Sequence, residues 1–409
     1  MPTAFAPDSG WIRFHAAVLA DETHLARLLA TPDAAACHDT ALALAAELGL
    51  TLAPEEITRA IANARHAWLL RHTAPIPPSA TAPDAPRSPH WLPIQLHPGD
   101  ASTCATVEWA SFGDLALTDP FFEQSIGAAL RHPARLLFRH HTSLDALAPL
   151  ADTAPELAPA GFVFHVSRCG STLVAQALAA DPRHRVLSEP SPLDQLLTFD
   201  AANPLLTLAQ RASRLRGVVH SYARRRRPEE ERLFIKFDAW HTLHLPVIRA
   251  AFPATPWIFL HRDPVEVLVS QHRQRGYQFI PGMMDPRPFG ITPEELPTLD
   301  FDTYTARILR AAFDAALVAL ATPGSPGLTV DYRNLRAALP GLLRAHFVVP
   351  DDETTRTALA AALPRHAKNP TLEFAADSEA KHREAGEPLR ALAARWLDEP
   401  RRRLLARNA

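Results

Sequence analysis

The segment Gly161-Phe-Val-Phe-His-Val-Ser-Arg-Cys-Gly-Ser-Thr-Leu173 decides the fold that the sequence predicts. Its apolar run, Phe162 to Val166, is rich in aromatic and β-branched residues and predicts a short buried strand. A turn of small residues follows, and apolar residues then recur at helical spacing until Asp181-Pro182 ends the helix. A strand, a turn and a helix N-terminus form a cradle for an anion, because the free N–H groups of the first helical turn point at the ligand.

The turn supplies the chemical groups that a phosphate-like anion needs. Gly170 lets the backbone approach closely, and Arg168 adds a fixed cation beside hydroxyl donors. The nucleotide-triphosphate loop requires Gly, four residues and then Gly-Lys-Ser/Thr. This chain has His165 at the first glycine and Ser171 at the lysine, so the cradle is not expected to serve ATP hydrolysis. The candidate anion-binding residues are Ser167, Arg168, Cys169, Gly170, Ser171 and Thr172.

The run Ser-Arg-Cys-Gly-Ser-Thr-Leu after a strand resembles the 5′-phosphosulfate loop of the sulfotransferase family. Members of that family carry Pro-Lys-Ser-Gly-Thr-Thr or Pro-Arg-Ser-Gly-Thr-Thr at this place, and the form found here is similar to bacterial and tyrosylprotein-type members. The resemblance covers roughly residues 156 to 375. It implies a three-layer αβα fold around a central parallel sheet, 3′-phosphoadenylyl sulfate (PAPS) as co-substrate, and no metal.

A second motif, Leu260-His-Arg-Asp-Pro-Val-Glu-Val-Leu-Val-Ser270, follows another buried apolar run. Pro264 stands where a helix can start, so Arg262 and Ser270 could present a guanidinium and a hydroxyl to one phosphate. The motif resembles the 3′-phosphate motif of sulfotransferases, which is Arg-x-x-Pro with Ser eight residues after the Arg. ATP has no 3′-phosphate, so the resemblance implies that Arg262 and Ser270 select PAPS.

The resemblance also implies catalytic residues. Lys236 closes an apolar strand, and Asp238 stands where cytosolic members carry a histidine base. That departure leaves the base open between Asp238 and Glu189. We favour Glu189, because tyrosylprotein sulfotransferases carry a base at the same separation from the loop arginine. Arg168 and Lys236 would neutralise charge during in-line sulfuryl transfer to a hydroxyl or an amine.

The chain divides into four parts by composition. Residues 1–72 are rich in Ala and Leu with helical periodicity, predict a small all-α domain, and loosely resemble Nif11-like helical domains. Residues 73–100 are crowded with prolines and predict an extended linker. Residues 101–155 are interpreted as an amino-terminal extension of the catalytic domain, which spans 156–409. Strands alternate with helices in this last part, and this predicts an α/β fold with a parallel sheet covered on both faces.

Composition excludes several classes of protein. Among 409 residues, 47% are hydrophobic and 21% charged, which is typical of a soluble globular protein, and the net charge of −2 gives no argument for nucleic acid or a membrane as partner. The three cysteines form no CxxC pair, so neither a zinc site nor a disulfide framework is expected. No apolar run approaches about 20 residues, and we expect a cytoplasmic protein.

Three points stay open. The acceptor could be a small molecule, a glycan or a peptide, and the amino-terminal helices could recruit a peptide, form a homodimer or cap the core. The enzymatic alternative is a P-loop kinase or nucleotide hydrolase. The non-enzymatic alternative is a nucleotide-binding or interaction module that kept the fold and lost transfer.

Overall fold

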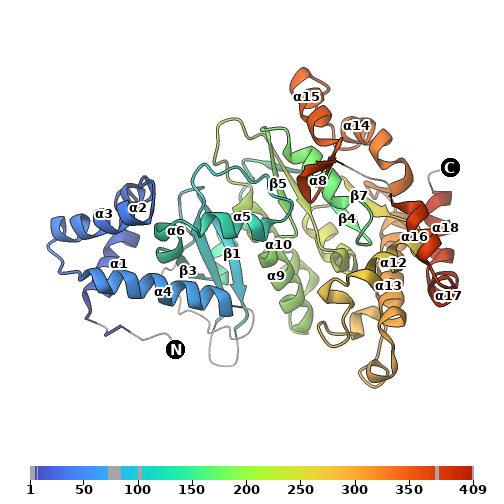
Figure 1. The fold of residues 1–409 in the computed structure, drawn as a ribbon, viewed down its shortest axis with the longest axis horizontal. Coiled ribbons are helices and arrows are strands. Elements are labelled where there is room, and N and C mark those ends of the chain that lie inside the picture. The colour runs from blue at the N-terminus through green and yellow to red at the C-terminus, as the bar shows by residue number, and fades with distance from the viewer. Residues whose placement is uncertain (1–4, 7, 72–83, 100–103, 374–376, 408–409) are drawn as a thin grey trace.

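The larger part of the molecule is built on a parallel sheet (Figure 1). The structure, a computed structural model, describes residues 5–6, 8–71, 84–99, 104–373 and 377–407. The sheet has the order β5-β6-β4-β7-β8, and all of its neighbouring strands run parallel. Its strands are β4 (Ala158–His165), β5 (His184–Ser188), β6 (Arg232–Lys236), β7 (Trp257–His261) and β8 (Gly327–Asp331). The predicted α/β fold with a central parallel sheet is therefore confirmed.

Helices follow the strands and flank the sheet. α8 (Ser171–Ala179) follows β4 directly and packs on β4, β5 and β6. α12 (Pro264–Arg273) follows β7, and Pro264 occupies its first position, as the sequence predicts. The other helices are α9 (Ser191–Ala202), α10 (Leu208–Tyr222), α11 (Leu245–Ala251), α13 (Phe301–Ala321), α14 (Leu335–Ala345), α15 (Glu353–Ala362), α16 (Ser378–Glu384), α17 (Glu387–Trp396) and α18 (Asp398–Ala406). A two-stranded hairpin, β9 (Arg365–His366) and β10 (Asn369–Glu373), lies between α15 and α16.

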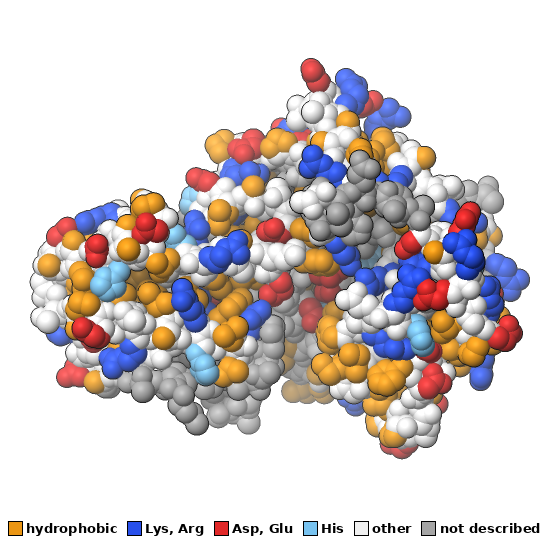
Figure 2. All heavy atoms as spheres, in the orientation of Figure 1, with side chains coloured by type: hydrophobic (Ala, Val, Ile, Leu, Met, Phe, Trp, Pro, Cys, Tyr) orange, Lys and Arg blue, Asp and Glu red, His pale blue; other side chains and the backbone are white. Residues whose placement is uncertain are grey.

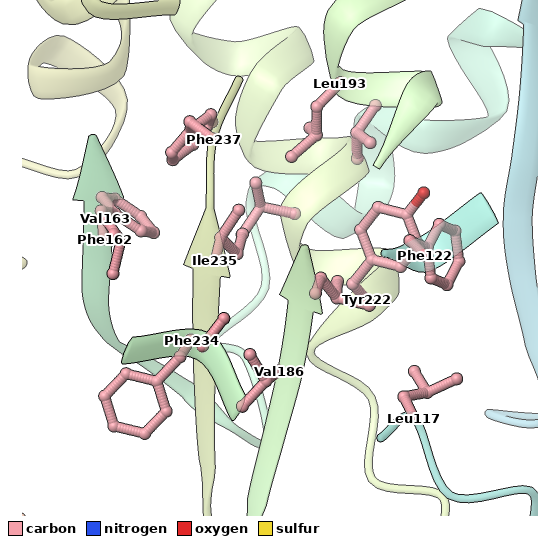
Figure 3. Packing of buried hydrophobic residues seen from close by; sticks show 14 of the residues in the cluster. Leu117, Phe122, Phe162, Val163, Val186, Leu193, Tyr222, Phe234, Ile235 and Phe237 are labelled. Atoms are coloured by element: carbon pink, nitrogen blue, oxygen red, sulfur yellow. The ribbon is translucent and has the colours of Figure 1, made fainter. Parts of the chain in front are cut away.

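Aromatic side chains hold the centre of the sheet together. Phe164 stacks on Phe237 with ring centroids 4.9 Å apart and meets Trp257 edge to face at 5.8 Å. Figure 3 shows Phe162 and Phe237 beside Ile235 in this core. Such pairs add about 0.5–1.5 kcal/mol each beyond burial. They help to fix the register, which sets Ser188 opposite Lys236 and His165 opposite Leu260. The carboxyl ends of the central strands therefore meet at one edge.

A smaller antiparallel sheet precedes the parallel one. It consists of β1 (Trp91–His97), β2 (Thr106–Ser111) and β3 (His140–Ser143) in the order β1-β2-β3. The prediction of an extended linker over 73–100 is wrong for residues 91–97, which form β1. A proline is tolerated on an edge strand beside a bulge, and Pro93 lies at the register shift of edge strand β1. Residues 73–83 and 100 of that linker lie outside the described residues.

The small sheet joins the amino-terminal helices to the larger part. Tyr222 of α10 donates a hydrogen bond to the Pro93 carbonyl of β1, at 2.8 Å. On the other side, Trp11 and Phe14 pack against Phe138, with ring centroids 5.8 and 6.1 Å apart. The helices here are α1 (Gly10–Ala20), α2 (Glu22–Leu29), α3 (Ala34–Glu47), α4 (Pro54–Leu70), α5 (Phe122–Ala129), α6 (Pro133–Leu137) and α7 (Ala148–Ala151). Among the described residues, no helix combines the length and apolar character needed to cross a membrane.

Candidate functional site

A cavity of about 510 Å³ opens at the carboxyl edge of the parallel sheet. Ligands of open α/β sheets bind outside the carboxyl ends of the strands, so this is the expected place for a site. The structure brings together most of the residues that the sequence singles out. The predicted residues that line the cavity are Ser167, Arg168, Gly170, Ser171, Thr172, Glu189, Asp238, Arg262 and Ser270. Cys169 and Lys236 are not part of the lining.

The loop between β4 and α8 has a strained backbone. Ser167 and Arg168 adopt left-handed φ angles of 68° and 54°, and Gly170 has φ 87° at the N-cap of α8. A Cβ atom at Gly170 would lie 2.7 Å from a methyl carbon of Leu335, so only glycine fits here. The Ser167 N–H donates to His165 Nδ1 at 2.9 Å. The loop therefore presents the start of α8 to the cavity.

Two loop residues point in different directions. Arg168 donates from Nη2 to the Gln274 carbonyl at 2.9 Å, which ties the loop to the end of α12. Cys169 is buried, and its Sγ lies 3.3 Å from the Leu260 carbonyl. Burial raises the pKa of the Cys169 thiol to about 12. The Cys169 side chain thus packs against the sheet, and this candidate anion-binding residue offers only its backbone to the cradle.

Lys236 and Glu189 form an ion pair at the ends of β6 and β5, in which the lysine is buried and the glutamate is partly exposed. The Lys236 side chain is 1% exposed, and its ammonium donates to Glu189 Oε1. Glu189 has a left-handed φ of 52°, and its N–H donates to the Lys236 carbonyl at 2.7 Å. His165 Nε2 lies 3.4 Å from the same Glu189 oxygen. Burial acts to raise the pKa of Glu189, but the Lys236 ammonium and His165 outweigh it and hold the pKa well below its usual range.

The pKa of Asp238 is shifted in the opposite direction from that of Glu189. Burial raises the pKa of Asp238 well above its ordinary value, and the charges of Glu189 and Asp194 raise it further. The surroundings therefore favour the ionised form of Glu189 and the protonated form of Asp238. The pKa values of the two carboxyl groups that sequence reasoning left as alternatives are shifted in opposite directions.

A histidine that the sequence did not single out holds the Asp238 turn in place. The Asp238 N–H donates to His241 Nδ1 at 3.2 Å, and His241 Nε2 lies 2.9 Å from Asp194 Oδ1. Trp240 Nε1 donates to the same Asp194 oxygen at 2.6 Å. Ligand atoms of Asp194, Asp238 and His241 lie within 4.8 Å of one another, but both histidine nitrogens are engaged by these contacts. No sequence signal joins Asp194 to His241, because they meet only through the fold of α9 onto the turn.

The other end of the cavity is built around Arg262. Arg262 is buried, its Nε donates to Glu266 on α12, and its guanidinium lies 4.1 Å from the Tyr332 ring centroid. Its Nη2 donates to Asp377 Oδ1, and Lys381 Nζ lies 2.7 Å from Asp377 Oδ2. Asp377 and Lys381 line the cavity and were missed by sequence reasoning. They belong to a part of the chain with no recognisable motif.

Aromatic side chains form the wall near Lys236. The Lys236 and Lys368 ammonium groups lie 5.1 and 5.4 Å from the Phe121 ring centroid. Trp240 and Tyr277 meet edge to face, with ring centroids 5.5 Å apart. All of these except Lys236 line the cavity, so an acceptor that reaches Glu189 would pass aromatic surface.

Comparison with known proteins gives a family and three solved structures. Residues 159–345 match the family model described as "Sulfotransferase family". The chain is similar to sulfotransferase STF9 from Mycobacterium avium at 14% identity (61% of this chain, 79% of that chain, TM-score 0.40). It is similar to sulfotransferase STF1 from Mycobacterium tuberculosis at 18% identity (67% and 85%, TM-score 0.37). It is also similar to the sulfotransferase domain of the Synechococcus olefin synthase at 19% identity (61% and 90%, TM-score 0.34). No curated protein matches the chain.

Proposed function

We propose that this protein, whose residues 159–345 match the sulfotransferase family model, transfers a sulfuryl group from PAPS to a hydroxyl or amine of an acceptor. The observation that carries the proposal is that two anion-binding elements line one cavity. The first is the loop from Ser167 to Thr172 with its helix N-terminus, and the second is Arg262 with Ser270. Two such elements suit a nucleotide that carries anions at both its 5′ and 3′ positions.

In the proposed transfer, each group of charged residues binds or neutralises a different part of the donor. The loop N–H groups and Arg168 bind the 5′-phosphosulfate, while Arg262 and Ser270 bind the 3′-phosphate. PAPS supplies the activated sulfuryl group. Lys236 neutralises the charge that develops on the leaving phosphate, and this electrostatic effect is commonly the largest contribution to catalysis. Because Arg262 and Ser270 bind the 3′-phosphate, they select a nucleotide that carries this group.

The opposite pKa shifts favour Glu189 as the general base. Both carboxyl groups line the cavity, but the pKa of Glu189 is held low, whereas the raised pKa of Asp238 favours its protonated form. A base must be ionised to accept the acceptor's proton, and Glu189 meets this condition. Lys236 holds the pKa of Glu189 down in the free protein, and the negative charge of a donor bound beside Glu189 opposes this effect and raises the basicity of Glu189 where transfer occurs.

Two alternatives make different predictions. A P-loop kinase or nucleotide hydrolase would need a lysine after Gly170, where the chain has Ser171. A module without transfer activity would bind the nucleotide and leave every acceptor unchanged. The acceptor class, whether small molecule, glycan or peptide, is to be found by a screen with radiolabelled PAPS.

The first test is calorimetric titration with 3′,5′-diphosphoadenosine, with ADP and ATP in parallel. We expect preferential binding of the 3′-phosphorylated nucleotide, weakened by roughly 10- to 100-fold in Arg262→Ala because a charge-assisted hydrogen bond is lost. The matched control is Arg403→Ala, since Arg403 is exposed on α18 and pairs only along its own helix with Glu399. Equal or tighter binding of ATP would contradict the proposal and favour the kinase.

A further inference from the structure

We propose that the Asp377 carboxylate occupies the place of the donor's 3′-phosphate in the free protein, and that Lys381 is a further ligand of that phosphate. This inference rests on the proposed function. It assigns Asp377 a role in nucleotide selection, because the nucleotide must displace a carboxylate of the protein's own chain in order to reach Arg262.

The first step of the argument is the bridging position of Asp377. One oxygen of its carboxylate accepts from Arg262 Nη2, and the other lies 2.7 Å from Lys381 Nζ. An anion with one oxygen on each of two cations is the arrangement that a phosphate makes with a pair of basic residues. The bridge lines the cavity together with Ser270, the residue that the family motif also assigns to the 3′-phosphate.

The second step is the difference in burial between the cations and the anion. The side chains of Arg262 and Lys381 are 5% and 4% exposed, whereas that of Asp377 is 44% exposed. Arg262 is also fixed from behind by Glu266 and the Tyr332 ring. Asp377 stands at the N-cap of α16, where its side chain makes no capping hydrogen bond. The carboxylate can therefore move to solvent while the cations stay.

The third step is charge balance. Figure 2 shows basic and acidic side chains crowded together over α16. Without Asp377, Glu266 would remain as the carboxylate on Arg262, and Lys381 would lose the carboxylate that holds it. A bound phosphate dianion replaces the single negative charge of Asp377 and adds a second one. An ionised buried group without its partner is strongly unfavourable. Once Asp377 has moved away, Arg262 and Lys381 should therefore bind an anion tightly.

The test compares Asp377→Asn, Lys381→Met and the control Glu384→Gln by calorimetry. Glu384 lies on the same helix, is 43% exposed, and pairs with Arg273 outside the cavity lining. We expect Asp377→Asn to bind 3′,5′-diphosphoadenosine about tenfold more tightly, Lys381→Met to bind it about tenfold more weakly, and the control to match the wild type. ADP, which lacks the 3′-phosphate, should bind all four proteins alike, and melting curves confirm that each is folded.

The possible outcomes distinguish a failure of this inference from a failure of the proposed function. If the wild type binds the 3′-phosphorylated nucleotide and folded Asp377→Asn binds it no better, the inference is wrong and the proposed function stands. If Asp377→Asn binds it and the wild type does not, displacement of Asp377 is supported directly. If neither binds it, both the inference and the proposed function are wrong.

Discussion

Each end of the cavity contains a carboxylate paired with a buried basic side chain, but the two carboxylates are held in different ways. At one end the carboxylate of Glu189 meets the buried ammonium of Lys236, and at the other the carboxylate of Asp377 meets Arg262 and Lys381. Glu189 is held by its own N–H on the Lys236 carbonyl, between paired strands. Asp377 begins a short helix and is nearly half exposed.

The comparison teaches that the surroundings of an ion pair decide its role. A carboxylate anchored between two strands keeps its place when a ligand enters and is suited to chemistry. A carboxylate at a helix start gives way to a stronger anion and is suited to selection. We therefore expect substitutions at the Glu189 end to change turnover, and substitutions at the Asp377 end to change nucleotide affinity.

The largest effect is expected from Glu189→Gln. Loss of a general base lowers kcat by roughly 100- to 10,000-fold, while calorimetry with 3′,5′-diphosphoadenosine should show unchanged affinity. In Glu189→Gln the buried ammonium of Lys236 loses its partner, and this lowers the stability of the fold. The double variant Glu189→Gln/Lys236→Met removes both charges and serves as the control for this loss of stability. A variant that keeps its turnover would show that the two ends do not differ in role.

A smaller loss of turnover, roughly 100-fold, is expected for Lys236→Met, together with a shifted pH profile. Lys236 holds the pKa of Glu189 down, so without it burial raises that pKa. The base must be ionised, and the acid limb of kcat/KM should move to higher pH by at least about one unit. An acid limb that stays at the wild-type pH would mean that Glu189 is not the group that titrates.

The smallest effect on turnover, less than about tenfold, is expected for Asp238→Asn, because an amide resembles the protonated acid that the raised pKa of Asp238 favours. Stability should rise. The folded pKa of Asp238 is raised, so its contribution to stability is complete below the unfolded value of about 3.9 and is lost as pH rises through the folded pKa. At neutral pH the variant should gain about 1 kcal/mol in urea unfolding, and near pH 3 the gain should vanish. A loss of turnover larger than that of Glu189→Gln would make Asp238 the base.

Much of the fold was predictable because its signals are local. The strand before the loop, the loop itself and Pro264 at the start of α12 lie within short runs of sequence, and the family match confirms the resemblance drawn from them. β1 was missed because a proline argues against a strand in general, while an edge position beside a bulge tolerates Pro93.

The missing parts of the site are set by tertiary contacts. Glu189 and Asp238 could be singled out by their spacing from other motifs, but their opposite pKa shifts depend on Lys236 and on Asp194, which reach them through folding. Asp377 and Lys381 follow no motif and meet Arg262 only when α16 packs on α12. The sequence therefore predicts which groups are present and leaves open which charges they carry.

The left-handed backbone at Ser167, Arg168 and Glu189 has a consequence for protein engineering. Glycine adopts this conformation freely, whereas other residues lose about 1 kcal/mol each there. A search for heat-resistant variants that scores stability alone will therefore favour glycine at Ser167 and Arg168, and it will remove the cation of the loop. At Glu189 the opposite holds, because loss of the carboxylate would leave the buried Lys236 without its partner, and this costs more than the backbone strain. A stabilising programme for this chain has to keep these positions fixed and look for its gains elsewhere.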